Sequence, residues 1–321
     1  MADVLSKVFV TGANGFIGRN VCERLERVGF AVTRACRSLA PGEDPHRWIV
    51  TGDLERCERL PESISGHDAI VHLAGRAHVL REAENDPRAA YQRANVEATA
   101  RLAAAAVAAG VRRFIFVSSI GVHGNRAERP LTENDPPAPC EPYAQSKLRA
   151  ERTLAEIARA SAMQTVVLRP TLVYGPQCPG NMARLARLVA RGLPLPFAGF
   201  TARRSLIGVE NLASLIEAAL LHPAAAGETF FAADGEDLSL PELIAHLAAG
   251  LGVRARLFKA PTGLIALAAR MAGQGAAFDK LTAPLRVDAG KARRLLGWSP
   301  PVPVAEGLRA TGRSFASPEA A

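Results

Sequence analysis

The feature that most constrains the fold is a set of three glycines, each three residues apart, near the start of the chain. Gly12, Gly15 and Gly18 follow directly on the apolar run 8–10 and precede a helical segment. At such a corner the first glycine permits a tight turn, the second lets a pyrophosphate approach backbone N–H groups at the helix N-terminus, and the third lets helix and strand pack closely. The spacing is not the standard G-x-G-x-x-G, but its place directly after a strand predicts dinucleotide binding. The loop residues that we assign to this site are Gly12, Asn14, Gly15, Phe16, Ile17 and Gly18.

Short apolar runs alternate with helical segments through the first half of the chain. The strand candidates are residues 8–10, 30–37, 49–50, 68–73, 114–117 and 165–168, and the two most regular helical segments are 95–109 and 142–160. Short buried runs that alternate with helices predict an α/β fold built on a doubly wound parallel sheet.

Beyond residue 170 the pattern changes. Glycine and proline become denser, and helical segments follow at 182–190, 211–221, 240–251 and 289–296. We therefore expect a dinucleotide-binding Rossmann domain at 1–174 and a smaller, mixed α/β substrate domain at 175–321, with part of 205–232 returning to the first domain.

Cysteine content and charge exclude several classes of function. The five cysteines are an odd number without metal-ligand spacing, which predicts free thiols in a reducing compartment and no metal site. No apolar run approaches the ~18 residues of a membrane span, and the N-terminus does not resemble a signal peptide, so we expect a cytoplasmic protein without a membrane span. The net charge of +8 is spread along the chain, without a basic stripe interleaved with aromatics, so nucleic acid is not an expected partner.

The end of the second predicted strand bears on the choice between NAD and NADP. An acidic residue there would bind the ribose hydroxyls, whereas an arginine would pair with a 2′-phosphate. The stretch 33–38 contains no acid and carries Arg37 at or next to the discriminating position. We therefore favour NADP, with NAD as the alternative. Asp53 and Leu54, after the third strand, are expected to meet the adenine.

A tyrosine and a lysine four residues apart form the candidate catalytic pair. On a helix, Tyr143 and Lys147 share one face, and a nearby cation is expected to pull the phenol's pKa down from about 10 toward neutrality. Tyr143 would then act as acid or base on a carbonyl or hydroxyl group. Ser118 and Ser119 end the preceding strand, where one hydroxyl could contact the same substrate oxygen.

These motifs together resemble the extended short-chain dehydrogenase/reductase family, in particular its nucleotide-sugar epimerase and 4-keto-reductase branch, over nearly the whole chain. The matching elements, in chain order, are Thr11-Gly12-Ala13-Asn14-Gly15-Phe16-Ile17-Gly18, Gly52-Asp53-Leu54, His72-Leu73-Ala74-Gly75, Asn95-Val96-Glu97-Ala98-Thr99, Val117-Ser118-Ser119, Tyr143-Ala144-Gln145-Ser146-Lys147, Leu168-Arg169-Pro170 with Val173-Tyr174-Gly175-Pro176, and Leu295-Leu296-Gly297-Trp298-Ser299-Pro300.

The resemblance implies roles for individual residues. Tyr143 would be the acid/base, Lys147 would hold the nicotinamide ribose, and Ser119, which aligns better than Ser118, would be the catalytic serine. Leu73, Ala74 and Gly75 would line the cofactor site, and Asn95 would support the active-site helix. In the second domain, Asn181 would meet the nucleotide end of a nucleotide-diphosphate sugar, Arg204 would clamp its diphosphate, and Arg286 would be a weaker second clamp.

Departures from the family pattern narrow the activity. The acid pair that dehydratases carry after the catalytic residue is replaced by Ile120-Gly121, and the family's Val-Tyr-Gly is Val122-His123-Gly124. His123 fits either a packing role or a polar contact with the sugar. The resemblance therefore implies 4-keto reduction or 4-epimerisation of a nucleotide sugar in surface-polysaccharide synthesis, by a homodimer joined through helices 95–109 and 142–160. A reductase of another small ketone and a non-catalytic dinucleotide sensor are the alternatives.

Overall fold

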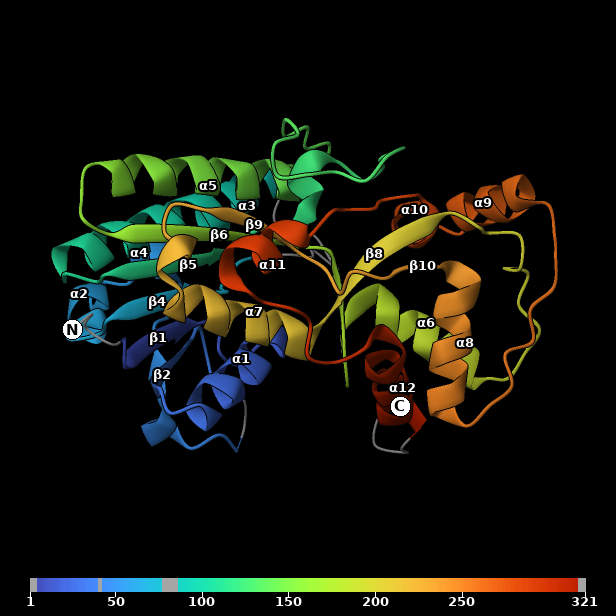
Figure 1. Ribbon diagram of the computed structural model, residues 1–321, viewed down its shortest axis with the longest axis horizontal. Coiled ribbons are helices and arrows are strands. Elements are labelled where there is room, and N and C mark those ends of the chain that lie inside the picture. Colours follow the sequence, from blue (N-terminus) through green and yellow to red (C-terminus); the bar gives the residue numbers. More distant parts are fainter. Residues whose placement is uncertain (1–4, 40–41, 77–85, 317–321) are drawn as a thin grey trace.

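Two sheets of unequal size organise the chain. The computed structural model describes residues 5–39, 42–76 and 86–316. The larger sheet has seven parallel strands in the order β3-β2-β1-β4-β5-β6-β9, and the smaller has three in the order β10-β8-β7. Strand order reverses between β1 and β4, which is where an open α/β sheet forms a ligand crevice. The predicted doubly wound parallel sheet is confirmed, with a smaller mixed sheet beside it (Figure 1).

The strands and helices lie close to the predicted segments. The strands of the larger sheet are β1 (Lys7–Thr11), β2 (Ala31–Cys36), β3 (Trp48–Val50), β4 (Ala69–His72), β5 (Arg113–Val117), β6 (Gln164–Pro170) and β9 (Thr229–Ala232). The helices beside this sheet are α1 (Phe16–Arg27), α2 (Leu60–Ile64), α3 (Pro87–Tyr91), α4 (Ala98–Ala108), α5 (Pro142–Arg159), α7 (Val209–Leu221) and α11 (Gly290–Leu296). No helix in the described part of the chain is long and apolar enough to cross a membrane.

Helices cover both faces of the larger sheet because alternate side chains of its strands point to opposite sides. Val8 and Val10 of β1 join one core with α1 and α7, whereas Phe9 joins a second core with α4 and α5. Phe114 and Phe116 of β5 lie in the second core as well. Strands buried on both faces explain why these segments are continuous apolar runs in the sequence.

The smaller lobe has its own core. Its strands are β7 (Leu172–Tyr174), β8 (Arg203–Gly208) and β10 (Asp237–Ser239), and its helices are α6 (Gly180–Ala190), α8 (Leu240–Leu251), α9 (Thr262–Met271), α10 (Gly275–Thr282) and α12 (Val304–Ala316). Helices α6, α8 and α12 pack together over the small sheet. A capping box starts α8, where Ser239 and Glu242 satisfy each other's backbone N–H groups.

The chain passes back and forth between the two sheets. β7 precedes residue 175 but pairs with β8 of the small sheet, whereas α7 and β9 lie within 205–232 and join the layers of the large one. Asp234 holds this junction together: it accepts hydrogen bonds from the Tyr174 hydroxyl at 2.6 Å and from Asn211 Nδ2 at 2.7 Å. The division at residues 1–174 and 175–321 stays a prediction.

Candidate active site

The glycine corner forms a backbone cradle at the end of β1. Gly12 has a φ of 68°, and a Cβ there would lie 2.8 Å from the Ala74 backbone nitrogen. A Cβ on Gly18 would lie 2.1 Å from the Gly12 carbonyl oxygen, so only glycine lets α1 pack this closely on the loop. Gly15 caps α1 without a side-chain hydrogen bond. The N-terminus of α1 is thus open toward a phosphate-bearing ligand.

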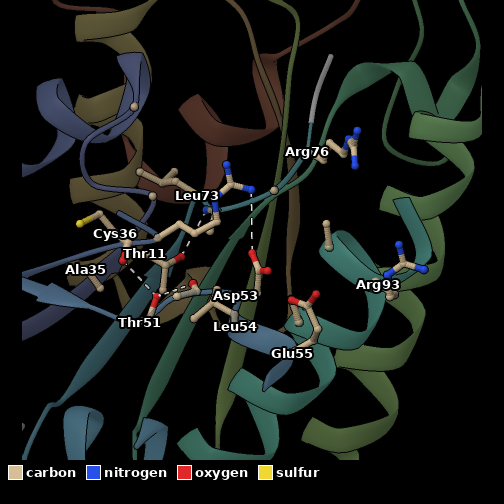
Figure 2. A pocket seen from close by; sticks show the side chains of 18 of the residues that line it. Thr11, Ala35, Cys36, Thr51, Asp53, Leu54, Glu55, Leu73, Arg76 and Arg93 are labelled. Carbon is tan, nitrogen blue, oxygen red and sulfur yellow. Dashed lines mark hydrogen bonds and ion pairs between the residues drawn. The ribbon is translucent and has the colours of Figure 1, made fainter. Parts of the chain in front are cut away.

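A cavity of about 780 Å³ extends from this cradle along the ends of β2, β3 and β4 (Figure 2). The residues predicted for the cofactor that line it are Gly12, Asn14, Gly15, Arg37, Asp53, Leu54, Leu73, Ala74 and Gly75. Phe16, Ile17 and Gly18 line the neighbouring cavity described below. Sequence reasoning missed Glu55, Arg56 and Arg93 and assigned no role to Arg76; all four border the first cavity.

Arg37 lies directly after β2 and lines this first cavity. Its Nη1 is 3.9 Å from Asp53 Oδ1, and both side chains are exposed. Such a pair contributes little free energy, so a ligand phosphate can replace the carboxylate as the partner of the guanidinium. With Arg56, Arg76 and Arg93 also on its wall, the cavity has more cations than acids.

A second cavity, of about 480 Å³, contains the predicted catalytic residues. Ser119, Tyr143 and Lys147 all line it, together with Gly75 at the end of β4. Ser119 follows β5 and caps the 3-10 turn Ile120–His123, where its Oγ accepts a hydrogen bond from the Gly121 N–H at 3.1 Å. The Ser119 hydroxyl also lies close enough to the Tyr143 phenol to lower its pKa. The fold therefore brings the three side chains together from β5 and α5.

Lys147 is buried one turn after Tyr143 on α5. Its Nζ donates to the Val117 carbonyl oxygen at 2.8 Å and lies 4.5 Å from the centre of the Phe116 ring. A Cβ on Gly75 would stand 3.5 Å from this Nζ. The ammonium is thus fixed between the end of β5 and Gly75, which borders both cavities, where the cofactor's ribose is expected.

The expectation of a lowered tyrosine pKa was wrong. Burial raises the pKa of Tyr143 to about 12, and the nearby Ser119 hydroxyl opposes this shift. Burial lowers the pKa of Lys147 to about 8, which nearby Glu151 opposes. The Lys147 ammonium is turned toward a backbone carbonyl, and loss of water around the phenol dominates. Tyr143 is therefore a proton donor at neutral pH.

Asn95 supports the catalytic helix from a π-helical segment, Gln92–Glu97. Its Nδ2 donates to Ser146 Oγ at 2.8 Å, and its Oδ1 accepts the Arg76 N–H at 2.8 Å. Asn95 lines neither cavity, but its Oδ1 is 3.0 Å from where a Gly75 Cβ would stand. A π-helical turn often marks a functional site.

A buried histidine connects this segment to the glycine loop. His72 Nδ1 is 2.7 Å from Thr11 Oγ1, and His72 Nε2 is 3.0 Å from Thr99 Oγ1. Thr99 donates to the Asn95 carbonyl, and Thr11 accepts the Ala74 N–H. Burial, with a smaller contribution from Lys147, lowers the pKa of His72 to about 3, so the ring is neutral.

His123 takes a packing role. Its Nε2 is 2.8 Å from Arg169 Nη1, and Arg169 in turn forms a buried two-pronged ion pair with Glu151. The imidazole packs edge-on against Phe231 and does not line the second cavity.

The far wall of the second cavity comes from the smaller lobe. Asn181 on α6 and Arg204 on β8 both line it. Arg204 is only 9% exposed; one guanidinium nitrogen donates to the Ala283 carbonyl, whereas Nε has no partner among the described residues. Burial lowers the pKa of Arg204 to about 10. Arg286 lines neither cavity.

Sequence reasoning missed three further residues around the second cavity. Lys280 on α10 forms an ion pair with Glu141 at 2.8 Å, and Asn125 Nδ2 donates to the other Glu141 oxygen at 2.8 Å. All three line the second cavity. The only sequence feature that could have pointed to this group is the position of Glu141, two residues before Tyr143.

Comparison with known proteins places the chain in a family. The pattern of the NAD-dependent epimerase/dehydratase family matches residues 8–233. A UDP-glucose 4-epimerase of Vibrio cholerae is 35% identical over 96% of this chain and 95% of its own length. An N-acetyl-α-D-glucosaminyl-diphospho-ditrans,octacis-undecaprenol 4-epimerase of Escherichia coli O157:H7 is 28% identical over 75% of this chain and 71% of its own. The solved complex of MoeE5 with UDP-glucuronic acid and NAD is 26% identical and has a TM-score of 0.77, with 97% of this chain and 99% of that chain covered.

The chain belongs to the NAD-dependent epimerase/dehydratase family, within the extended short-chain dehydrogenases/reductases. The predicted family resemblance is thereby confirmed.

Proposed function

We propose that this protein carries out redox chemistry at C4 of a nucleotide-diphosphate sugar, as a 4-keto reductase or a 4-epimerase. The observation that carries the proposal is that one cavity has hydroxyl groups on one side and a buried cation on the other. Ser119 and Tyr143 supply a hydroxyl and a phenol on one side, and Arg204 supplies a buried cation on the other, whose Nε has no partner among the described residues. A diphosphate pairs with a guanidinium through charge-assisted hydrogen bonds.

The backbone cradle fits a nicotinamide dinucleotide. The open N-terminus of α1 suits its pyrophosphate, and the long cavity beyond suits the adenosine. When bound, NAD(P) supplies the hydride carrier. Lys147 would hold the nicotinamide ribose next to Gly75. For the cofactor we propose NADP(H), supported by Arg37 and by the excess of arginines around the first cavity, with NAD as the alternative.

The chain's own residues supply the proton and orient the sugar. Tyr143, protonated at neutral pH, donates to the sugar O4 as it gains negative charge, and Ser119 holds that oxygen in place. Arg204 and Asn181 anchor the nucleotide end, so binding energy from the remote diphosphate orients C4. In the reverse direction the same tyrosine accepts the proton.

The deciding experiment supplies UDP- and dTDP-linked 4-keto sugars and 4-hydroxy sugars in separate reactions. Oxidation of NADPH or NADH, followed by absorbance, identifies a net reductase. Interconversion of 4-epimers without net cofactor turnover, followed by NMR, identifies an epimerase. Lack of both reactions, together with turnover of a small ketone without a nucleotide, would replace the nucleotide-sugar function with that of a small-ketone reductase.

A biological role and an assembly are part of the same proposal. We assign the reaction to polysaccharide precursor synthesis in the cytoplasm, supported by the related epimerase that acts on a lipid-diphosphate-linked sugar and by five free cysteines. We also propose a homodimer through α4 and α5, which pack side by side and leave Ala104, Ala108 and Arg149 exposed. A concentration-independent monomer in light scattering would rule out the dimer.

A further inference from the structure

Helix α9 presents large apolar side chains to solvent. None of its residues is buried, and Leu264, Leu267 and Met271 are 65%, 54% and 83% exposed. Spacings of three and four residues place these three side chains on one face of the helix. Contiguous exposed apolar side chains on a soluble domain usually mark an interaction site.

The stretch of chain that contains α9 carries charged side chains of one sign only. Residues 243–278 contain no Asp or Glu, but they contain Arg254, Arg256, Lys259 and Arg270. All four of these cations are exposed. The stretch 243–278, from within α8 to the start of α10, is therefore cationic and apolar, and no carboxylate within it offsets the positive charge.

The segment that leads into α9 has the same character. Val253, Ala255 and Leu257 pack inward on the core of the smaller lobe, so the alternate residues Arg254, Arg256 and Phe258 face solvent. Figure 1 shows this segment running along the outer edge of the smaller lobe, from the end of α8 up to α9, at the end of the molecule opposite the seven-stranded sheet. We define the α9 patch as Arg254, Arg256, Phe258, Lys259, Leu264, Leu267, Arg270 and Met271.

We propose that this patch docks the protein on an anionic membrane surface. Apolar side chains of an interfacial helix enter the boundary between headgroups and acyl chains, while neighbouring arginines pair with lipid phosphates. A second copy of the chain is a poorer fit, because a symmetric contact would place four cations of each copy opposite those of the other without an acid between them.

Docking here brings the substrate cleft close to the lipid. Helix α9 packs against α10, whose Lys280 lines the second cavity. The patch thus lies one helix away from the wall of the cleft. The proposal does not depend on which sugar the cleft accepts.

The experiment is co-sedimentation of the full chain with vesicles of phosphatidylcholine alone, and with vesicles of phosphatidylcholine and phosphatidylglycerol in equal parts. We expect binding to the mixed vesicles only, with release at high salt as screening shortens the range of the charges. The triple variant Leu264→Ser, Leu267→Ser, Met271→Ser should bind at least about tenfold more weakly. In the double variant Arg254→Ser, Arg256→Ser, the affinity for the mixed vesicles should fall about fivefold for each charge removed.

Matched controls remove the same residue types elsewhere. Val28→Ser with Leu221→Ser removes exposed apolar side chains next to the larger sheet, and Arg27→Ser removes an exposed cation there. Both control variants should bind vesicles as the wild type does.

Equal binding by the α9 triple variant and the wild type, or no binding of the wild type to mixed vesicles, would overturn the proposal. So would a wild-type oligomer that the triple variant dissociates, since a second copy would then cover the patch. Turnover of a soluble nucleotide sugar should be unchanged in the triple variant, which separates this test from that of the proposed function.

Discussion

Lys280 and Glu141 form an ion pair of 2.8 Å between the smaller lobe and the start of the catalytic helix. Glu141 is the N-cap residue of α5 and lies two positions before Tyr143, and its charge raises the pKa of that tyrosine. Lys280 therefore does two things at once. It ties α10 to the element that carries the acid, and it compensates a carboxylate that would otherwise disfavour the phenolate.

Replacing Lys280 with methionine should impair the reaction more than the fold. We expect kcat/KM to fall about tenfold and the alkaline limb of its pH profile to move to higher pH, because an uncompensated Glu141 opposes ionisation of Tyr143. The free energy of unfolding should change by less than about 1 kcal/mol, since the pair is only partly buried. Lys291→Met is the matched control: it breaks the Lys291–Glu228 pair of 2.6 Å, whose residues line neither cavity. Equal kinetic effects of the two variants would show that Lys280 has no special role.

Tyr143→Phe should abolish turnover while cofactor affinity stays the same. Only the hydroxyl is lost, and general acid–base catalysis contributes about 10²–10⁴-fold. Tyr174→Phe is the control, because Tyr174 is fully buried on Asp234 and lines neither cavity; it should lower the melting temperature but not kcat. Undiminished activity of Tyr143→Phe would reject the mechanism for any substrate.

Arg204→Ala should weaken UDP binding by about 1.5–3 kcal/mol, roughly tenfold to hundredfold, and leave NADP affinity unchanged. The reason is that Arg204 lines the second cavity and not the first. Arg286→Ala should weaken UDP less, because Arg286 lines neither cavity. Calorimetry with UDP and NADP on each variant makes the comparison. Failure of wild type to bind UDP or dTDP at millimolar concentration would contradict the nucleotide-sugar proposal.

Arg37→Ala should weaken NADP binding by about 1.5–3 kcal/mol and leave NAD binding nearly unchanged, because only the 2′-phosphate pairs with this guanidinium. Arg56→Ala, on the same cavity, tests whether the effect is specific to Arg37 or reflects general positive charge. Tighter binding of NAD than of NADP by the wild type would assign NAD as the cofactor.

Stability should fall on mild acidification because of His72. The pKa of its ring is about 3 in the folded protein against about 6.5 for an unperturbed histidine, so the unfolded chain binds a proton first. Stability is therefore fully present above about pH 6.5 and is lost as the pH falls toward 3, by up to about 1.4 kcal/mol per pH unit. Chemical denaturation at several pH values should show a shallower acid slope for His72→Gln, and an unchanged slope for the exposed His46→Gln. Equal slopes for all three proteins would contradict the assignment.

Local signals determined the architecture and part of the site. Continuous apolar runs such as 114–117 identify strands buried on both faces, and the three glycines identify the turn after β1. Both features can be predicted from the sequence because they depend on residues that are neighbours along the chain. The four-residue spacing likewise fixed Tyr143 and Lys147 on one face of α5.

Only the tertiary structure determined the pKa values of the catalytic residues and the residues that form the far wall of the cleft. The pKa of Tyr143 depends on how much water the packed lobes exclude, and spacing along a helix does not report this. Lys280 reaches Glu141 across 139 positions of sequence, and the burial of Arg204 beside Ala283 depends on a loop 79 residues away. Such contacts arise when distant segments pack, so no local pattern encodes them. The positive charge of residues 243–278 can be read from the sequence. The exposure of the apolar face of α9, on which the proposed membrane contact depends, is visible only in the folded structure.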